Sequence, residues 1–258
     1  TCTVSNTANV LLTLNGFPLH KGPLVKDYAA PSLINDVLVK GQNELSLSII
    51  QDADNPDPDS SFVATIVVKD YSEEDYFTPE SGELMPVYLP LDQGETEKDK
   101  VFSSEWTMNA LVNASEKRYF LQADLDFSSL LLGPSLNVSD QDLFAYGEKL
   151  IELMRNADAQ GFLKEYMPKL RTIAHLKGII ITDLLPMMSA QIAEISSLKL
   201  IEEIKAENIG IRRWCNDRIY EIFIKPNFNL IVTNEGTDGN VTLPVYVSLI
   251  NGELKIVR

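Results

Sequence analysis

The sequence predicts a two-domain α+β protein, with an N-terminal antiparallel β-sandwich followed by three helices packed on an antiparallel sheet in a cone-like arrangement. Three observations predict this class. The first half contains short runs of alternating apolar and polar residues, the second half opens with helical periodicity, and it closes with a meander of strands. The pattern changes at Gly133-Pro134, so we expect one domain at residues 1–133 and another at residues 134–258.

Short β-rich runs separated by turns predict the strands of the first domain. Asn9–Asn15 alternates before it meets Gly16, and Glu44–Ile50 alternates until its last residue. Phe62–Val68 and Met85–Leu91 are also rich in β-forming residues. Several short strands at this spacing are typical of an antiparallel sandwich, either a jelly roll or an immunoglobulin-like fold.

Two segments of the first domain resemble the opening strands of galactose-binding-like jelly-roll modules. Leu14–Leu19 holds an Asn-Gly hairpin, and Ile34–Ile49 holds a Gly-x-Asn-x-Leu turn that enters an alternating strand. Such modules accompany many bacterial glycosidases and exported proteins. The resemblance implies a sandwich that serves as a scaffold or as a binding module.

Capping residues and apolar periodicity predict the first two helices of the second domain. Ser139 and Asp142 have the spacing of an N-terminal capping box, and the helix that follows runs to Asn156. Asp158 can cap the second helix, which Pro168 ends or kinks.

A third helix and a strand meander complete the second domain. The helix begins at Asp183, and its apolar stripe keeps helical spacing until Asn208. The stripe comprises Leu184, Met188, Ile192, Ile195, Leu198, Ile201 and Ile204. The strands are expected at Trp214–Ile224, Phe228–Thr233, Leu243–Ile250 and Leu254–Val257. Asn251-Gly252 is a two-residue hairpin signal between the last two strands.

The first helices of this domain resemble those of the nuclear transport factor 2 superfamily, which includes polyketide-cyclase-like and ketosteroid-isomerase-like enzymes. The resemblance covers Tyr146–Asp158 and Phe162–Pro168. It implies a cone whose catalytic members use an Asp or a His as general base. Because no residue of this chain matches their catalytic motifs, the resemblance assigns no catalytic residue.

Charge and motif content exclude several classes of function. The chain has 22 Lys and Arg against 37 Asp and Glu, a net charge of -15. Residues 1–133 hold 8 basic and 21 acidic residues, or -13, and residues 134–258 hold 14 and 16, or -2. An acidic chain argues against a general nucleic-acid partner, and no apolar run reaches the ~20 residues of a transmembrane helix. Phosphate-binding, dinucleotide-binding, zinc-hydrolase and nucleophile-elbow motifs are also missing.

An oxygen-rich loop is the candidate metal site. Asp52, Asp54, Asp57 and Asp59 could bind calcium, the one cofactor that the sequence suggests. The loop lacks the Gly and Glu of an EF-hand and contains two prolines, so a solvated turn is the alternative.

A cation and aromatic side chains on one predicted strand form the candidate binding site. Arg213, Trp214 and Tyr220 could bind an anionic or carbohydrate ligand at the mouth of a cone. The alternative is that these strand aromatics belong to the core.

The expected location is outside the cytoplasm. The chain starts at Thr1 without Met or a signal peptide, and we favour a periplasmic, envelope-associated or secreted bacterial protein. Cys2 leaves three alternatives, namely a lipid-attachment remnant, a disulfide with Cys215, or two buried thiols.

The absence of a sharp catalytic motif favours a non-catalytic binding or interaction module, whose partner is a small molecule, a glycan or an envelope protein. The first alternative is a small-molecule binder, or an isomerase-like or cyclase-like enzyme, with a pocket in the second domain. The second alternative is a structural component that works by forming oligomers.

Overall fold

The computed structural model describes residues 2–4, 8–24, 37–50, 61–68, 100–107, 115–123, 131, 133–176, 179–197, 206–226, 228–232 and 242–258. Within these residues the fold is mixed α+β, with three α-helices and antiparallel sheets, so this coarse part of the predicted class is confirmed. The chain forms two compact units. The first comprises Thr1–Thr13, Leu19–Leu33 and Ser46–Tyr119, and the second comprises Leu14–Pro18, Ile34–Leu45 and Phe120–Arg258.

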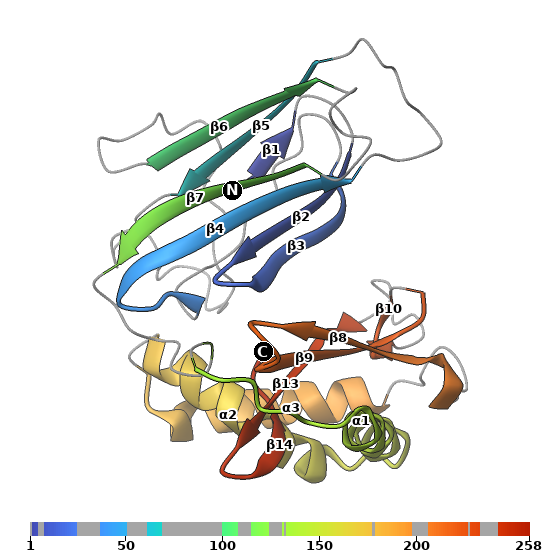
Figure 1. Cartoon of the computed structure of the whole chain (residues 1–258). Helices are drawn as coiled ribbons and strands as arrows, with labels where there is room; N and C mark the ends of the chain where they lie inside the picture. The colour runs from blue at the N-terminus through green and yellow to red at the C-terminus, as the bar shows by residue number, and fades with distance from the viewer. Residues whose placement is uncertain are drawn as a thin grey trace. The chain divides into compact units, whose positions relative to one another are not determined.

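Two sheets are built from the N-terminal half of the chain (Figure 1). One has the order β3-β2-β4-β7, formed by β2 (Ala8–Leu14), β3 (Phe17–Leu24), β4 (Gly41–Ile50) and β7 (Ser115–Ala123). The other has the antiparallel order β1-β5-β6, formed by β1 (Cys2–Val4), β5 (Ser61–Val68) and β6 (Lys100–Thr107). The strands predicted near residues 9–15, 44–50 and 62–68 are confirmed, whereas Met85–Leu91 lies outside the described residues.

A buried amide holds the turn between β2 and β3. Asn15 and Gly16 form this turn with φ of 53° and 77°, the left-handed values that an Asn-Gly hairpin uses. The Asn15 amide donates to the backbone oxygen of Val37 at 2.9 Å and to Oδ1 of Asn43 at 2.8 Å. Asn43 is fully buried, and both its oxygen and its nitrogen bond to the backbone of Val39. The two turn motifs predicted from the sequence therefore meet in one hydrogen-bond network.

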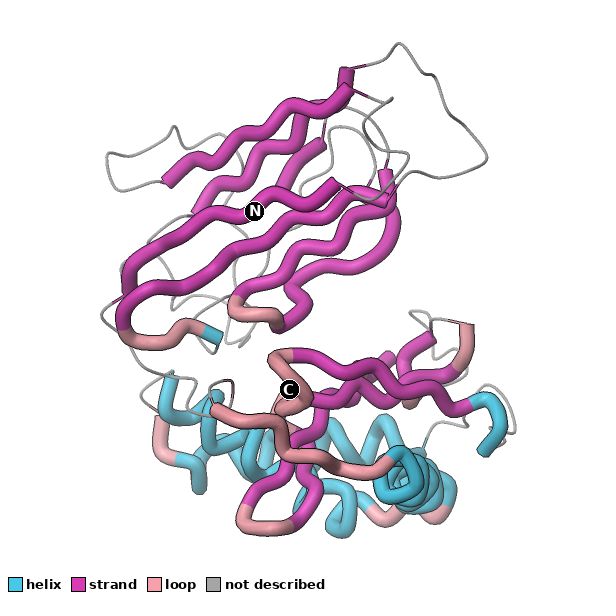
Figure 2. Tube along the Cα trace, in the orientation of Figure 1, coloured by secondary structure: helices cyan, strands magenta, loops and turns pink. Residues whose placement is uncertain are grey.

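Three helices follow in the second unit. They are α1 (Asp140–Arg155), α2 (Ala159–Leu176) and α3 (Ile181–Ser197). Figure 2 shows the irregular segment that leads into α1. Ser139 caps α1 as predicted, because its Oγ accepts a hydrogen bond from the backbone nitrogen of Asp142 at 3.1 Å. Pro168 lies inside α2 and does not end it. Beyond Ser197, the predicted stripe residues Leu198, Ile201 and Ile204 lie outside the described residues.

A five-stranded antiparallel sheet packs against these helices. It comprises β8 (Ile209–Trp214), β9 (Ile219–Ile224), β10 (Phe228–Asn229), β13 (Val245–Ile250) and β14 (Glu253–Ile256). A short 3-10 helix, η4 (Ala206–Asn208), precedes it, and β11 (Ile231–Val232) pairs separately with β12 (Thr242–Leu243). The predicted continuous strand Trp214–Ile224 is wrong, because a turn at residues 215–218 divides it into the β8–β9 hairpin.

The helices cover one face of this sheet (Figure 1). α1 contacts β8 and β9, α2 contacts β14, and α3 packs on α2. Gly147 allows α1 to approach closely, since a Cβ at this position would lie 3.0 Å from Cγ2 of Ile222. Leu143, Leu150 and Phe162 are among the almost fully buried side chains that fill the space between the layers. The interior is therefore an apolar core, and polar chemistry must be sought at its margins.

The opposite face of the sheet carries the turn between β2 and β3, which belongs to the same unit. The Phe17 ring lies 5.0 Å from the Tyr246 ring, and the Arg258 guanidinium lies 4.6 Å from the Phe17 ring. A Cβ at Gly16 would lie 3.4 Å from the backbone of Cys215. This turn is therefore part of the packing of the C-terminal sheet.

Candidate functional site

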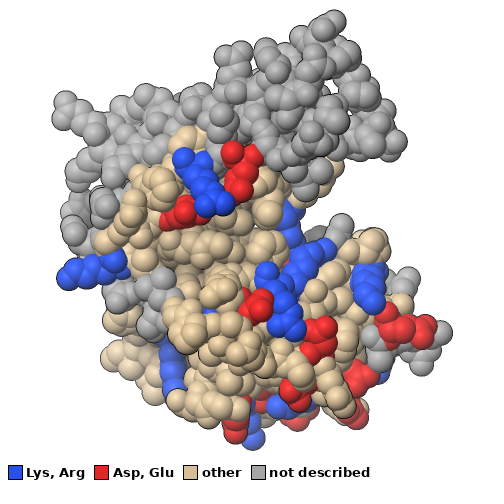
Figure 3. Space-filling view, in the orientation of Figure 1, with Lys and Arg blue, Asp and Glu red and all other residues tan. Residues whose placement is uncertain are grey.

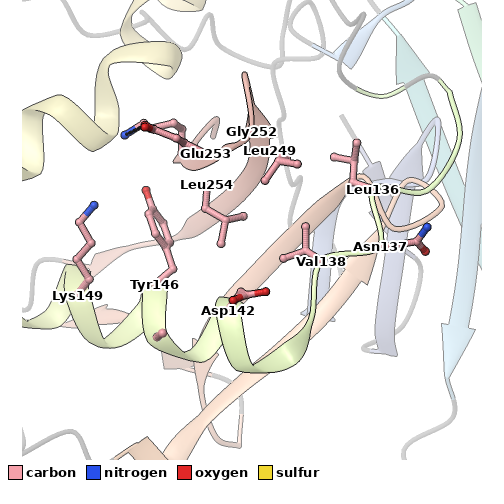
Figure 4. Close-up of a pocket in the computed structure, with 12 residues that line it drawn as sticks. Leu136, Asn137, Val138, Asp142, Tyr146, Lys149, Leu249, Gly252, Glu253 and Leu254 are labelled. Carbon is pink, nitrogen blue, oxygen red and sulfur yellow. Dashed lines mark ion pairs between the residues drawn. The ribbon is translucent and has the colours of Figure 1, made fainter.

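A hollow of about 730 Å³ opens between α1 and the β13–β14 hairpin (Figure 4). Its size falls within the range of small-molecule sites. It is lined by Leu136, Asn137, Val138, Asp142, Ala145, Tyr146, Lys149, Leu249, Gly252, Glu253, Leu254 and Lys255. These residues come from the segment before α1, from one face of α1 and from the hairpin.

The lining of the hollow divides into a polar end and an apolar end (Figure 4). We define the polar end as Tyr146, Lys149, Glu253 and Lys255. We define the apolar end as Leu136, Val138, Leu249 and Leu254, the last two of which are direct partners across the hairpin; Asn137 and Asp142 lie on the same side of the hollow. A ligand that lies along the hollow would therefore meet charged groups at one end, and at the other end aliphatic side chains with Asn137 and Asp142 beside them.

A buried carboxylate on α2 lies behind the polar end. The Glu165 side chain is only 7% exposed. It accepts hydrogen bonds from the Tyr146 hydroxyl at 2.8 Å and from the Lys149 ammonium at 2.8 Å. The Lys255 ammonium lies 3.2 Å and 3.3 Å from its two oxygens. We call these four residues the Glu165 cluster, and it joins α1, α2 and β14.

The Glu165 cluster holds its charges in fixed states. Burial raises the pKa of Glu165, but hydrogen bonds from Lys149 and Tyr146 outweigh it and leave the pKa below its usual value. Burial and the bond to Glu165 raise the pKa of the Tyr146 phenol. Burial lowers the pKa of Lys255, but its bonds to Glu253 and Glu165 outweigh this and leave the pKa raised. Near neutral pH, Glu165 is therefore an anion, Lys255 a cation and Tyr146 a neutral donor.

A tightly held turn anchors the apolar wall of the hollow. Cys215, Asn216 and Asp217 have positive φ of 53°, 54° and 58°, a conformation that costs about 1 kcal/mol or more at Cys215 and that Asn and Asp tolerate more readily. The backbone oxygen of Asp217 accepts bonds from the backbone nitrogen of Leu136 at 3.1 Å and from the Tyr220 hydroxyl at 2.6 Å. These bonds fix the segment that carries Leu136 at the rim.

The structure separates the three binding residues predicted from the sequence. Arg213 lies over the ring of Tyr220 at 5.3 Å, so these two are brought together. Arg213 donates to the backbone oxygen of Val138 and to the carboxylate of Asp140, and Tyr220 lies behind the same segment. Both therefore support the wall of the hollow without lining it. Trp214 lies on the opposite face of the sheet, because successive residues of a strand point to opposite sides.

A second polar cluster occupies that opposite face. Glu221 is 2% exposed and accepts bonds from Arg212 at 3.4 Å and from the Trp214 indole at 3.2 Å. The Arg212 guanidinium stacks 3.7 Å from the centre of the Phe223 ring. Since these groups are paired with one another, we assign this cluster a structural role in the β8–β9 hairpin.

The sequence also predicts a calcium-binding loop. Asp52, Asp54, Asp57 and Asp59 lie outside the described residues. Among the residues that are described, no group of three or more His, Cys, Asp or Glu side chains is arranged to hold a metal ion.

Both cysteines are buried free thiols. Burial raises the pKa of Cys2 to about 11 and that of Cys215 to about 12. At neutral pH each is therefore a protonated, weakly nucleophilic thiol. The predicted disulfide alternative is not formed in this structure.

The exposed charges of the second unit are of both signs, and Figure 3 shows them interspersed on one face. This agrees with the nearly balanced charge of residues 134–258. Among the helices in the described part of the chain, none has the length and apolar character needed to cross a membrane.

Comparison of the chain with protein-family models, with curated proteins and with solved structures gives no significant match. The resemblances to jelly-roll modules and to the nuclear transport factor 2 superfamily therefore stay predictions.

Sequence reasoning missed the Glu165 cluster. One signal was present, since Glu165 lies three residues after Phe162 and one before Tyr166, within the apolar face of α2. A charged residue at such a position is almost never buried unless it is paired. The position of Glu165 in the apolar face of α2 therefore indicated that Lys or Arg side chains from other helices or strands would pair with it.

Proposed function

We propose that this chain is a non-catalytic binding module and that the hollow between α1 and the β13–β14 hairpin is its ligand site. One observation carries the proposal. A buried, ionised Glu165 fixes two ammonium groups and one hydroxyl at the polar end of a hollow whose other end is mainly aliphatic. A few fixed polar groups within an apolar lining are typical of small-molecule sites.

The protonation states favour binding over acid–base catalysis. A general acid or base works best when its pKa lies near the operating pH. In the Glu165 cluster, the pKa values of Glu165, Tyr146 and Lys255 are all displaced away from neutrality. His20 lies in β3 and His175 in the last turn of α2, so neither histidine lines the hollow. The isomerase-like or cyclase-like alternative receives less support, because Leu, Ile and Phe side chains fill the interior.

The finer features of the fold and the location are part of this proposal. The order of helices followed by an antiparallel meander supports a cone-like second domain, and the two N-terminal sheets support a jelly-roll-like sandwich. Because the jelly-roll resemblance is to modules of exported bacterial proteins, we place the chain in the periplasm or at the cell envelope. Fractionation of the bacterial cells tests this location, and recovery in the cytoplasm alone would refute it.

Filling the hollow should abolish ligand binding. Ala145 is an exposed residue of α1 that lines the hollow, so Ala145→Trp would fill it without changing a buried residue. We expect small amphipathic molecules and oligosaccharides, screened by thermal shift, to include ligands that raise the melting temperature of the wild type by a few degrees. The same ligands should not protect Ala145→Trp.

The matched control is Glu148→Trp, which adds the same ring to an exposed position of α1 outside the hollow. This variant should respond to the ligands as the wild type does. The proposal is contradicted if the screen finds no ligand, or if the ligands protect Ala145→Trp as well as they protect the wild type.

A further inference from the structure

We infer that the hollow takes an apolar molecule with one carboxylate group, whose head binds at Lys149 and whose chain lies against the apolar end. This inference rests on the proposed function and names the class of ligand for the same site. It is carried by two features of the lining: the unused donors of Lys149 at the polar end and the aliphatic side chains at the apolar end.

Lys149 has hydrogen-bonding capacity directed at the hollow. Its ammonium carries three donors, and within the described part of the chain it bonds to one oxygen of Glu165. The Lys149 side chain is 49% exposed and lines the hollow. Glu165 already accepts bonds from Tyr146 and Lys255 as well. Lys149 can therefore gain an anionic partner without losing the one it has.

The charges at the polar end are balanced when Glu253 is counted. The cluster contains two ammonium groups, Lys149 and Lys255, against one buried carboxylate. Glu253 lies 3.1 Å from Lys255 but is 72% exposed, so water and salt screen that pair. With Glu253 counted, the polar end holds two cations and two anions, so a single carboxylate would bind through the remaining donors of Lys149 and not through a net positive charge.

The remaining acidic residue of the lining lies away from the polar end. Asp142 accepts a hydrogen bond from the Ser139 hydroxyl at 2.6 Å, as part of the cap of α1. It lies seven residues before Lys149 on the same helix face, which is about 10 Å along the helix axis. A head group at Lys149 is therefore separated from Asp142 by about two helical turns.

The apolar end supplies a surface for the chain of the ligand. Leu136, Val138, Leu249 and Leu254 line it, with Asn137 and Asp142 beside them. Each CH₂ group buried there would contribute up to about 0.8 kcal/mol. A short alkyl chain of about eight carbons should reach from Lys149 to these side chains and remain soluble enough for titration.

Calorimetric titration with octanoate, octylammonium and 1-octanol tests the inference on the full chain. We expect octanoate to bind the wild type at least tenfold more tightly than the other two probes. Lys149→Gln should weaken octanoate about tenfold, and Lys149→Arg, which keeps the charge, should restore most of the affinity. Higher salt should weaken octanoate and leave octanol unchanged.

Lys164→Gln is the matched control, because Lys164 is an exposed lysine of α2 that does not line the hollow. It should bind octanoate as the wild type does. Equal binding of the three probes, equal binding of octanoate by Lys149→Gln, or no binding of octanoate would overturn the inference.

The Ala145→Trp screen separates these failures from failure of the proposed function. If other ligands are blocked by Ala145→Trp, the hollow is a binding site and only the ligand class is wrong. If none is blocked, the proposed function fails together with this inference.

Discussion

Replacing Glu165 with Gln is expected to lower the free energy of unfolding by about 2–3 kcal/mol at pH 7. The substitution keeps the shape of the side chain but removes the charge that Lys149 and Lys255 share. A buried pair that loses one partner typically costs more, about 3–5 kcal/mol. Here the lysines are partly exposed and can turn toward water, so we expect a smaller loss. Urea unfolding followed by circular dichroism measures it.

The dependence of this loss on pH has a definite sign. The pKa of Glu165 is lowered in the folded state, so folding favours the ionised carboxylate. Its contribution is present above the unfolded pKa of about 4.3 and is lost as the pH falls through the lower folded pKa. The stabilities of the wild type and Glu165→Gln should therefore approach each other as the pH falls below about 4 and through the folded pKa. Glu152→Gln, at an exposed position of α1, is the control. Equal stability of the two variants at pH 7 would show that Glu165 contributes nothing.

Gly210→Ala is expected to lower the free energy of unfolding by about 2–3 kcal/mol, although alanine favours a strand more than glycine does. A Cβ at Gly210 would lie 2.4 Å from Cζ of Phe223, its partner across the β8–β9 hairpin. The ring cannot retreat freely, because Phe223 is buried and Arg212 stacks on it. The added methyl group must therefore displace packed atoms.

A double-mutant cycle separates this clash from a general effect of the substitution. In a Phe223→Leu background the ring is absent, so Gly210→Ala should cost at least 1 kcal/mol less than it does in the wild type. Chemical unfolding of the four proteins gives the coupling. If the cost is the same in both backgrounds, contact with Phe223 is not its cause.

The parts of the fold that could be predicted from the sequence depend on local interactions. Ser139 and Asp142 cap α1 because a side chain satisfies a free backbone donor three residues away, which is visible in the sequence. The Asn251-Gly252 hairpin is also local, and Ile250 pairs with Glu253 as the motif predicts. Such elements need no knowledge of their tertiary neighbours.

The β8–β9 hairpin was not predicted from the local sequence pattern. Apolar residues on both sides of residues 215–218 suggested one strand, yet Asn216 and Asp217 are turn formers that tolerate positive φ. These two residues indicated a turn, but the apolar residues on both sides favoured a continuous strand in the prediction. Bonds from Leu136 and Tyr220 to the turn are long-range contacts that no local pattern reveals.

The candidate site was not predictable for a related reason. Tyr146 and Glu165 are 19 residues apart, and Glu165 and Lys255 are 90 residues apart, so their meeting depends on how three elements pack. The sequence placed an Arg and aromatics on the right sheet, but Arg213 and Trp214 are neighbours in a strand and point to opposite faces. Hydrophobic periodicity identifies the face that is buried, and it does not identify the margin where a hollow opens.

The most direct test of the binding site is a nuclear magnetic resonance titration of octanoate into protein with labelled leucine and valine methyl groups. Leu249, Leu254 and Val138 line the hollow, whereas Leu170 lies fully buried in the core. We predict saturable shifts of the three lining residues and no shift of Leu170. Unchanged lining resonances at saturating octanoate, or shifts centred elsewhere in the chain, would contradict the assignment of this hollow as the ligand site.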